Sequence, residues 1–323
     1  MSLPPSSGAP LRRRVTAVLC ALLCLPTLLP AVGSAAPAQA RVIHHAQGST
    51  TLAGSPQRVV TLFQGANDTA VALGVTPVGV VDAWAQGANY DYLDAALAGV
   101  PHVGLETQPS MEAIAMLEPD LIIASKRRHE RIYPQLSRIA PTVSVDTVFD
   151  VEETLAVMGQ ALNREARAEA LWQQWQRRLA EVRGQLQASL GDRWPLSVTL
   201  LNVRADHVRI YLGGSYAGTV LDQLGFRRPA AHPSDQWVLK LTTKESIPII
   251  DADRIFVFME DSPAVRDNYQ AWTGHPLWQN LQAETNGAVY PVDAVAWNLA
   301  GGLISAHRML DQVAHHFGLE PSP

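Results

Sequence analysis

Cysteine is almost absent from this chain of 323 residues, which contains only Cys20 and Cys24. Two cysteines cannot build a disulfide scaffold or a four-cysteine metal site. Positive charge is also scarce, because 25 basic residues against 30 acidic ones give a net charge of −5, which argues against a generic nucleic-acid binder. Hydrophobic residues make up 47% of the chain and charged residues 17%, so the composition is that of a folded protein with a sizeable core.

Long apolar runs are missing apart from one short segment near the N-terminus. Arginines at positions 12–14 precede an apolar stretch from Val15 to Leu29, and small residues follow up to Ala40. This order is typical of a secretory signal peptide, so we expect residues 1–40 to be removed. A retained membrane anchor is an alternative, but the stretch falls short of the roughly 20 residues that span a bilayer. A lipid-modified cysteine is another, although both cysteines follow leucine rather than a small residue.

Cleavage would make the net charge of the protein more negative. The remaining residues, 41–323, contain 22 basic and 30 acidic residues, a net charge of −8, and no cysteine. We therefore expect an acidic protein in the periplasm or another extracytoplasmic location.

Four short apolar runs predict buried strands of mainly parallel sheets. The runs are continuous rather than alternating and are rich in β-branched and aromatic residues, as in strands covered by helices on both faces. They are Val59–Phe63, Leu121–Ala124, Val198–Leu201 and Ile255–Phe258. Helical segments lie between them, and two of these end at Gly74 and Gly225, where glycine can cap a helix in the left-handed conformation.

A long helix is predicted over residues 163–189, which are rich in good helix formers. Its apolar residues recur at three- and four-residue steps and form one stripe: Leu171, Trp175, Leu179 and Val182. A helix of 25 residues is about 37 Å long, which is enough to join two lobes. We predict an α/β protein with an N-terminal lobe at 41–162, a linking helix at 163–189 and a C-terminal lobe at 190–323.

The two halves share a faint internal repeat. Glu112 is followed eight residues later by Asp120 and then by a predicted strand, and Glu245 is followed in the same way by Asp253 and a strand. Each unit predicts a short helix that opens with glutamate, a turn that ends in aspartate, and a buried strand. The repeat therefore agrees with an architecture of two related lobes.

Signatures of enzymes and metal sites are mostly missing. Residues 213–217 come one residue short of the G-x-S-x-G nucleophile elbow, so a secreted serine hydrolase that uses Ser215 is kept only as an alternative of a different class. Glycine-rich phosphate loops do not occur. The ten histidines include no pair at i, i+4 with a neighbouring carboxylate. We predict a protein that is not an enzyme and that has no metal ligands of its own.

Arginines and aromatic residues gather after the predicted strands, where open α/β sheets bind ligands. Guanidinium groups pair with carboxylates and other oxyanions, and aromatic rings cover planar ligand surface. The candidate ligand-binding residues are Trp84, Arg127, Arg128, Arg204, Tyr211, Tyr216 and Trp297. Arg209 follows the same loop as Arg204, but we leave it out because a strand residue there can point away from the cleft. Arginines gathered in an acidic protein indicate an anionic small-molecule ligand. The alternative is that Arg127, Arg128 and Arg131 form only a solvated helix face, and the residues alone do not decide between the two.

The chain resembles the ferric-siderophore binding proteins of ABC importers. The matching segments cover both halves in order: Pro56–Leu62, Ala72–Val80, Pro109–Ile114, Leu117–Ile123, Ile139–Thr142, Val208–Tyr211, Gly218–Phe226 and His275–Trp278. This resemblance implies two Rossmann-like lobes with mainly parallel sheets, which are joined by a single long backbone helix and hold the ligand between them.

The resemblance also implies a ligand and a partner. The ligand would be an iron(III)–siderophore complex of the ferric citrate or hydroxamate type, in which siderophore oxygens hold the iron, so the protein needs no cofactor. Cobalamin and haem are alternative ligands of the same fold. One exposed glutamate on each lobe docks onto the permease dimer in such proteins, and these positions correspond to Glu112 and Glu245. We expect a monomer that binds no nucleic acid.

Overall fold

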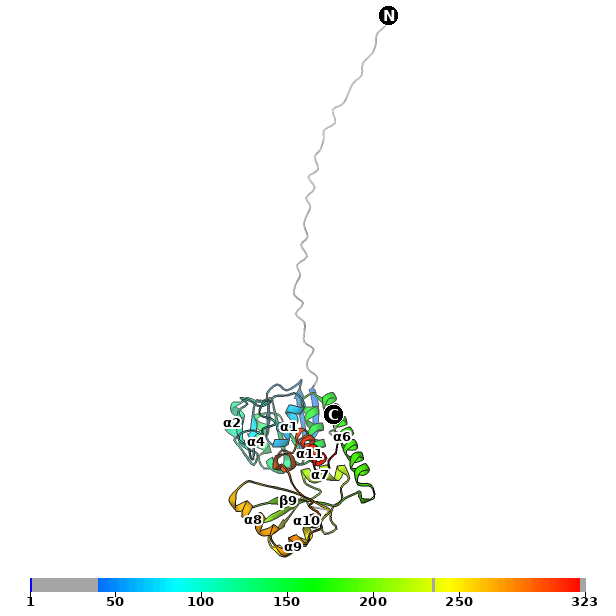
Figure 1. Ribbon diagram of the computed structural model, residues 1–323. Coiled ribbons are helices and arrows are strands. Elements are labelled where there is room, and N and C mark those ends of the chain that lie inside the picture. Colours follow the sequence, from blue (N-terminus) through cyan, green and yellow to red (C-terminus); the bar gives the residue numbers. More distant parts are fainter. Residues whose placement is uncertain (2–39, 234–235, 320–323) are drawn as a thin grey trace. The chain divides into compact units, whose positions relative to one another are not determined.

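The computed structural model describes residue 1, residues 40–233 and residues 236–319, so the predicted signal peptide lies outside the described residues apart from Met1 and Ala40. From residue 40 onward the described chain belongs to one compact unit (Figure 1). Within these ranges no helix has the length and apolar content that crossing a membrane requires.

The N-terminal half contains parallel strands in two small sheets. Its strands are β1 (Ala40–His45), β2 (Gly48–Ala53), β3 (Val59–Thr61), β4 (Val80–Asp82), β5 (His102–Leu105), β6 (Gln108–Pro109), β7 (Leu121–Ser125) and β8 (Thr142–Val145). One parallel sheet has the order β3-β7-β8, and in the other β4 runs parallel to β5, which pairs antiparallel with β6. A parallel bridge between Val60 and Gly79 connects the two sheets. The first two strands form a separate antiparallel hairpin.

Helices follow these strands and cover their apolar side chains. They are α1 (Gln64–Ala72), α2 (Met111–Met116), α3 (Lys126–His129), α4 (Tyr133–Ile139) and α5 (Val151–Ala161). The apolar run that predicted β7 is fully buried, as a strand covered on both faces should be. The turn after α1 has Gly74 at a φ of 75°, which agrees with the predicted left-handed helix end.

The C-terminal half is built on one five-stranded sheet. Its strands are β9 (Val198–Val203), β10 (Val208–Tyr211), β11 (Val238–Leu241), β12 (Arg254–Met259) and β13 (Val289–Pro291), in the order β11-β10-β9-β12-β13. The pairs β9–β12 and β12–β13 are parallel, whereas β10 is antiparallel to both of its neighbours. The remaining elements are η1 (Gly191–Arg193), α7 (Tyr216–Leu224), η2 (Lys244–Ile250), α8 (Pro263–Thr273), α9 (Pro276–Gln279), α10 (Gln282–Thr285), the π-helix η3 (Val295–Leu299) and α11 (Leu303–His316).

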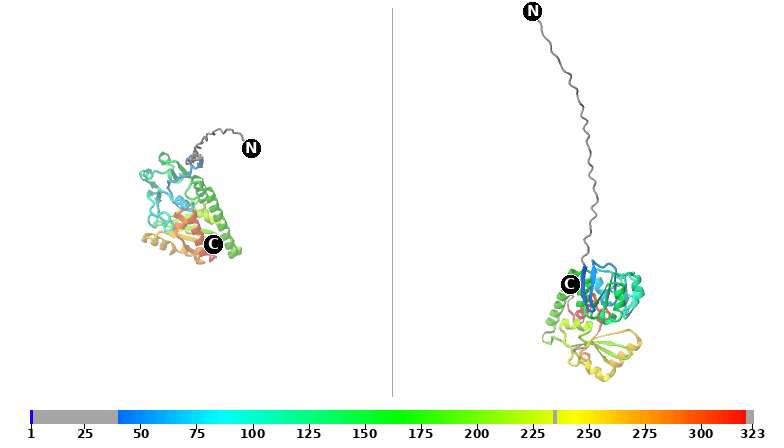
Figure 2. Two further views of the ribbon diagram at one scale, coloured as in Figure 1. Left: turned by 90° about the horizontal axis from the view of Figure 1, so that it is seen from above. Right: turned by 180° about the vertical axis from the view of Figure 1, so that it is seen from behind.

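A single long helix, α6 (Glu165–Leu190), connects the halves, as the sequence predicts. Trp175, Leu179 and Val182 of the predicted stripe are buried, and Leu171 packs against the same core. The helix contacts α5 on one side and α7 on the other, and it runs beside both halves in Figures 1 and 2. The α/β class with two lobes and one backbone helix is thus confirmed, whereas the division at residues 162 and 190 stays a prediction.

The internal repeat corresponds to a shared structural feature. The carboxylate of Asp120, which precedes β7, accepts the backbone N–H groups of Gln57 at 2.7 Å and Arg58 at 2.8 Å, just before the neighbouring strand β3. Asp253, which precedes β12, accepts the N–H of Ser197 at 2.6 Å and its hydroxyl at 2.7 Å, just before the neighbouring strand β9. Each aspartate therefore fixes the starts of two adjacent parallel strands.

The N-terminus of α11 is bound to α1 through a buried aspartate. Asp68 accepts the N–H of Ile304 at 2.8 Å, the N–H of Ser305 at 3.0 Å and the hydroxyl of Tyr92 at 2.7 Å. Burial raises the pKa of Asp68, although these three donors favour the carboxylate form. A side chain at Gly302 would collide with Asp68, so the close approach requires glycine there. This contact fixes the C-terminal helix against the N-terminal half.

Candidate ligand-binding site

A cavity of about 250 Å³ lies between residues of the two halves. Its lining consists of Gln64, Gly65, Trp84, Glu106, Arg128, Val148, Phe149, Arg209, Tyr211, Trp237, Asn298, Leu299, Ala300 and Gly301. The residues from the N-terminal half follow the ends of β3, β4, β5, β7 and β8, which is where open α/β sheets bind ligands. Four residues from the C-terminal half come from η3 and the turn before α11. A π-helix of this kind occurs often at functional sites.

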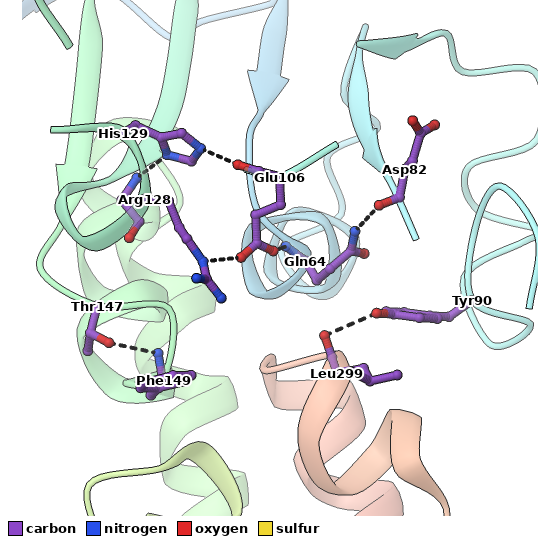
Figure 3. Close-up of polar contacts among 10 residues, drawn as sticks. Gln64, Asp82, Tyr90, Glu106, Arg128, His129, Thr147, Phe149 and Leu299 are labelled. Atoms are coloured by element: carbon purple, nitrogen blue, oxygen red, sulfur yellow. Dashed lines mark hydrogen bonds and ion pairs between the residues drawn. The ribbon is translucent and has the colours of Figure 1, made fainter. Parts of the chain in front are cut away.

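Arg128 projects into this cavity from α3 and is held by a buried carboxylate. Its Nε atom donates to Oε1 of Glu106 at 2.7 Å, and the Glu106 side chain is only 4% exposed. The guanidinium group extends past Glu106 toward the space between Phe149 and Leu299 (Figure 3). Because Nε makes the contact, the two terminal nitrogens keep the fork geometry that pairs with carboxylates.

The other oxygen of Glu106 stabilises the start of α1. Oε2 accepts the backbone N–H of Gln64 at 3.2 Å, and the residue at the helix N-cap, Phe63, supplies no side-chain cap of its own. A carboxylate at this position satisfies one free N–H group and interacts favourably with the helix dipole. Glu106 thus bridges a helix N-terminus and a cavity arginine.

His129 fixes the turn that carries Glu106. Its Nδ1 accepts the N–H of Ser125 at 3.1 Å, so Nε2 carries the proton and donates to the carbonyl oxygen of Glu106 at 2.9 Å. Burial lowers the pKa of His129 to about 4, and the neighbouring Arg128 charge acts in the same direction. The imidazole is therefore neutral at pH 7, and it links the end of β7 to the turn between β5 and β6.

Arg209 enters the cavity from the C-terminal half, which corrects its exclusion at the sequence level. It lies two residues before Tyr211 on β10, so both side chains are on the same face of the sheet. Nε of Arg209 donates to Nε2 of His207 at 2.9 Å, and Nδ1 of His207 lies 2.6 Å from the carboxylate of Asp206. This second cavity arginine is also held through its Nε atom.

An aromatic pair joins the two halves beside the cavity. Phe149 stacks on Trp237 with ring centroids 5.4 Å apart, and Tyr211 packs edge-on against Trp237 at 6.0 Å. The guanidinium of Arg127 lies 4.9 Å from the Phe149 ring and 5.0 Å from the Trp237 ring. Burial lowers the pKa of Arg127, and the charge of Arg128 adds to this effect. Arg127 thus packs on the aromatic wall by cation–π contacts and is not itself part of the cavity lining.

Three of the predicted ligand-binding residues line the cavity: Trp84, Arg128 and Tyr211. Trp84 is 40% exposed, whereas Tyr211 is buried in the aromatic wall. Arg204 lies just beyond the end of β9, where its carbonyl accepts the side-chain amide of Asn268 at 2.7 Å. It is not among the residues that line the cavity, so its predicted contact with ligand is not supported by its position.

Tyr216 and Trp297 lie in the hydrophobic core, which corrects the expectation that they face the ligand. Tyr216 is 2% exposed, and its hydroxyl contacts the carbonyl of Gly302 at 3.2 Å and Oγ of Ser305 at 2.9 Å. Trp297 is fully buried and donates from its indole N–H to Gln312 at 3.0 Å. Both residues follow a strand in the sequence, but local helical turns direct their side chains inward.

Glu106, Phe149 and Trp237 line the cavity but are not among the residues predicted from the sequence. Phe149 follows β8 by four residues, so the rule about strand ends could have found it if it had been applied there. Trp237 directly precedes β11 and has no comparable signal. Glu106 lies in a short turn, and its role depends on the distant N-terminus of α1.

Ser215 has a structural role. It is the N-cap of α7, where its hydroxyl donates to the carbonyl of Leu212 at 2.7 Å and accepts the N–H of Gly218 at 3.1 Å. It is 2% exposed, so the geometry does not support the serine hydrolase alternative. Among the described residues, no three histidine, cysteine or acidic side chains are grouped so that they could hold a metal ion.

The two glutamates of the repeat occupy similar places in the two halves. Glu112 lies in the first turn of α2, which is capped by Ser110, and Glu245 lies in the first turn of η2. Both are exposed. Hydrogen bonds to its own backbone N–H and to Thr243 lower the pKa of Glu245. Both side chains are available to a partner, and their docking role stays a prediction.

Known proteins resemble this chain over most of its length. Residues 59–296 match the sequence model of a family described as periplasmic binding protein. An achromobactin-binding periplasmic protein of Dickeya dadantii is 53% identical over 266 residues, which is 82% of this chain and 87% of that protein. An Fe(3+)-citrate-binding protein of Bacillus subtilis is 32% identical over 85% of each chain. The crystal structure of Staphylococcus aureus SirA complexed with staphyloferrin B has a TM-score of 0.83 and 42% identity, and it covers 87% of this chain and 99% of that one.

Proposed function

Because the chain belongs to the periplasmic binding protein family, we propose that it captures an iron(III)–siderophore complex between its two lobes and delivers it to an ABC importer. The observation that carries this proposal is the pair of cavity arginines, one from each half, each held through Nε. Terminal guanidinium nitrogens on two sides of one cavity suit a ligand with several carboxylate or other oxyanion groups.

The names of the relatives indicate the same class of ligand, a chelator of iron(III) with carboxylate or other oxyanion groups. They are said to bind achromobactin, Fe(3+)-citrate and staphyloferrin B. We infer that this chain takes an anionic, oxygen-rich ferric chelate and that the chelator supplies the ligands of the iron. The protein then acts as a receptor, without a cofactor of its own and without catalysis, in the periplasm or an equivalent extracytoplasmic location after removal of residues 1–40.

Tryptophan fluorescence tests this function directly. Trp84 and Trp237 line the cavity, so a ferric complex bound there should quench their emission, and the metal-free chelator should quench it much less. Ferric staphyloferrin B, ferric achromobactin, ferric citrate and a ferric hydroxamate form the panel, with haem and cobalamin as the alternative ligands. No saturable quenching by any ferric complex would contradict the proposal, and a saturable Soret shift with haem would replace it.

Delivery to a permease dimer is proposed to use Glu112 and Glu245. Charge reversal by Glu112→Arg and Glu245→Arg should abolish most uptake of the ferric complex while its affinity for the isolated protein stays unchanged. Glu130→Arg is a control, because Glu130 is another exposed glutamate and lies outside both repeat positions. Loss of affinity in either variant, or equal loss of uptake in the control, would contradict this role. Light scattering of the purified protein should give the mass of a monomer.

A further inference from the structure

Three hydrogen-bonded polar side chains run from the loop between β9 and β10 to the cavity. Asp206 is at the surface, with 75% of its side chain exposed, whereas His207 is 6% exposed and Arg209 lines the cavity. The three side chains are connected in sequence, from carboxylate to imidazole to guanidinium, by contacts of 2.6 Å and 2.9 Å. A buried histidine between a carboxylate and a ligand-facing arginine is not needed to build the strand, since β10 pairs through its backbone.

Only one protonation state of His207 fits these contacts. Arg209 has donors and no acceptor, so Nε2 of His207 must accept the proton of Arg209 Nε. The ionised carboxylate of Asp206 accepts only, so Nδ1 must carry the imidazole proton. The hydrogen bond with His207 lowers the pKa of Asp206, which agrees with a carboxylate there. The histidine is therefore a neutral imidazole whose tautomer is fixed from both sides.

We infer that His207 is a positioning residue of the ligand-binding cavity, which holds Arg209 in its ligand-facing orientation through the acceptor nitrogen of its imidazole. This inference rests on the proposed function for its biological meaning, but the arrangement itself can be measured without ligand. A side chain without an acceptor at position 207 would release Arg209 from its fixed orientation, and the affinity for an anionic ligand should then fall.

The backbone around His207 is also held by neighbouring elements. Arg204, at the end of β9, donates its backbone N–H to the carbonyl of His207 at 2.9 Å. From α8 the side-chain amide of Asn268 donates to the same carbonyl at 3.4 Å. Lys240 of β11 pairs with Arg209 in the strand register, so both side chains lie on the same face of the sheet. The imidazole itself is therefore placed between Asp206 and Arg209 by a fixed backbone.

Histidine variants separate a positioning role from a merely structural one. The affinity for ferric staphyloferrin B is measured at pH 7.5. His207→Ala removes the acceptor and should bind about fivefold more weakly, the loss of one hydrogen bond. His207→Gln keeps an acceptor oxygen and should bind like the wild type, so the conservative variant rescues the loss.

His44→Gln, at an exposed histidine on β1, is the matched control and should bind like the wild type. Equal affinities of the wild type and His207→Ala, or a loss of affinity in His207→Gln as large as that in His207→Ala, would overturn the inference.

A measurement without ligand keeps this test separate from that of the proposed function. The Nε–H signal of Arg209 in an NMR spectrum, assigned by its disappearance in Arg209→Lys, should be protected from exchange at pH 7.5 in the wild type and in His207→Gln. It should be unprotected in His207→Ala. Failure of the wild type to bind any ferric complex would contradict the proposed function alone, whereas identical Arg209 signals in all the proteins would overturn the role of His207.

Discussion

Both cavity arginines donate a hydrogen bond from Nε, but the group that accepts this bond differs between the two halves. Arg128 of the N-terminal half donates from Nε to the buried carboxylate of Glu106, whereas Arg209 of the C-terminal half donates from Nε to the imidazole of His207. In both cases the contact is made by Nε, so the two terminal nitrogens take no part in it. The chemistry offered to a ligand is thus similar on the two sides, although the local folds that produce it are unrelated.

The two accepting groups, Glu106 and His207, differ in how firmly the surrounding structure fixes them. Glu106 is connected to the N-terminus of α1 and, through its carbonyl, to His129. The imidazole of His207 contacts a single exposed carboxylate, and the His207 carbonyl accepts the N–H of Arg204 and the side-chain amide of Asn268. A hydrogen bond from a guanidinium to a carboxylate is stronger than one to a neutral imidazole. We expect the arginine of the N-terminal half to be held more firmly than that of the C-terminal half.

The largest effect should come from breaking the contact of Asp68, which fixes α11 against α1 of the N-terminal half. Asp68→Ala leaves the N–H groups of Ile304 and Ser305 without their acceptor in a buried place, and it removes the partner of the Tyr92 hydroxyl. We expect the free energy of unfolding to fall by about 3 kcal/mol, more than for an ordinary helix cap, because three donors are affected. Urea unfolding followed by circular dichroism measures this loss.

A matched control for this change is Asp94→Ala, because Asp94 is exposed and lies far from α11 in the sequence. Its free energy of unfolding should stay within about 0.5 kcal/mol of the wild type. If Asp68→Ala were equally mild, the contact between α1 and α11 would not fix the two halves, and the comparison of the two arginines as opposite walls of one cavity would lose its basis.

Removal of each arginine should have unequal effects on affinity. Arg128→Ala deletes a cation and leaves the buried carboxylate of Glu106 unpaired and facing an anionic ligand, so we expect a loss of about 100-fold. Arg209→Ala leaves only a neutral histidine behind it, so we expect a loss of about tenfold. Titration with ferric staphyloferrin B measures both. Arg131→Ala, an exposed arginine of the same segment, should bind normally. Equal losses of affinity in Arg128→Ala and Arg209→Ala would contradict the distinction between Glu106 and His207 as the accepting groups.

Much of the fold could be predicted because its signals are local. The helix α6 follows from helix-forming residues and one apolar stripe, and the buried strands follow from continuous apolar runs. The four predicted strands pair in parallel, as their continuous apolar runs indicate, but the direction of β10 could not be predicted in the same way. The apolar residues of β10 indicate that it is buried and contain no information on whether its neighbours run parallel or antiparallel to it.

The site could be predicted only in part, since its polar contacts connect distant segments. The rule about strand ends located Trp84, Arg128 and Tyr211. It could not identify Glu106, because that residue acts through the N-terminus of a helix 42 positions earlier in the chain. It also placed Tyr216 at the ligand, because the sequence did not show that Ser215 starts a helix and thereby turns the tyrosine inward.

The smallest effect should come from Tyr216, which is predicted at the ligand from the sequence but lies in the hydrophobic core. A change there tests where the cavity ends and the core begins. Tyr216→Phe removes a hydroxyl whose neighbour, Ser305, still donates to the carbonyl of Gly302 at 2.8 Å. The free energy of unfolding should therefore fall by only about 1 kcal/mol, while the affinity for the ferric complex stays the same. Tyr211→Ala is the matched change at the cavity wall, and it should weaken binding several-fold, since it deletes a ring that packs against Trp237. If Tyr216→Phe weakened binding as much as Tyr211→Ala does, its hydroxyl would have to reach the ligand, and the cavity would extend to α7.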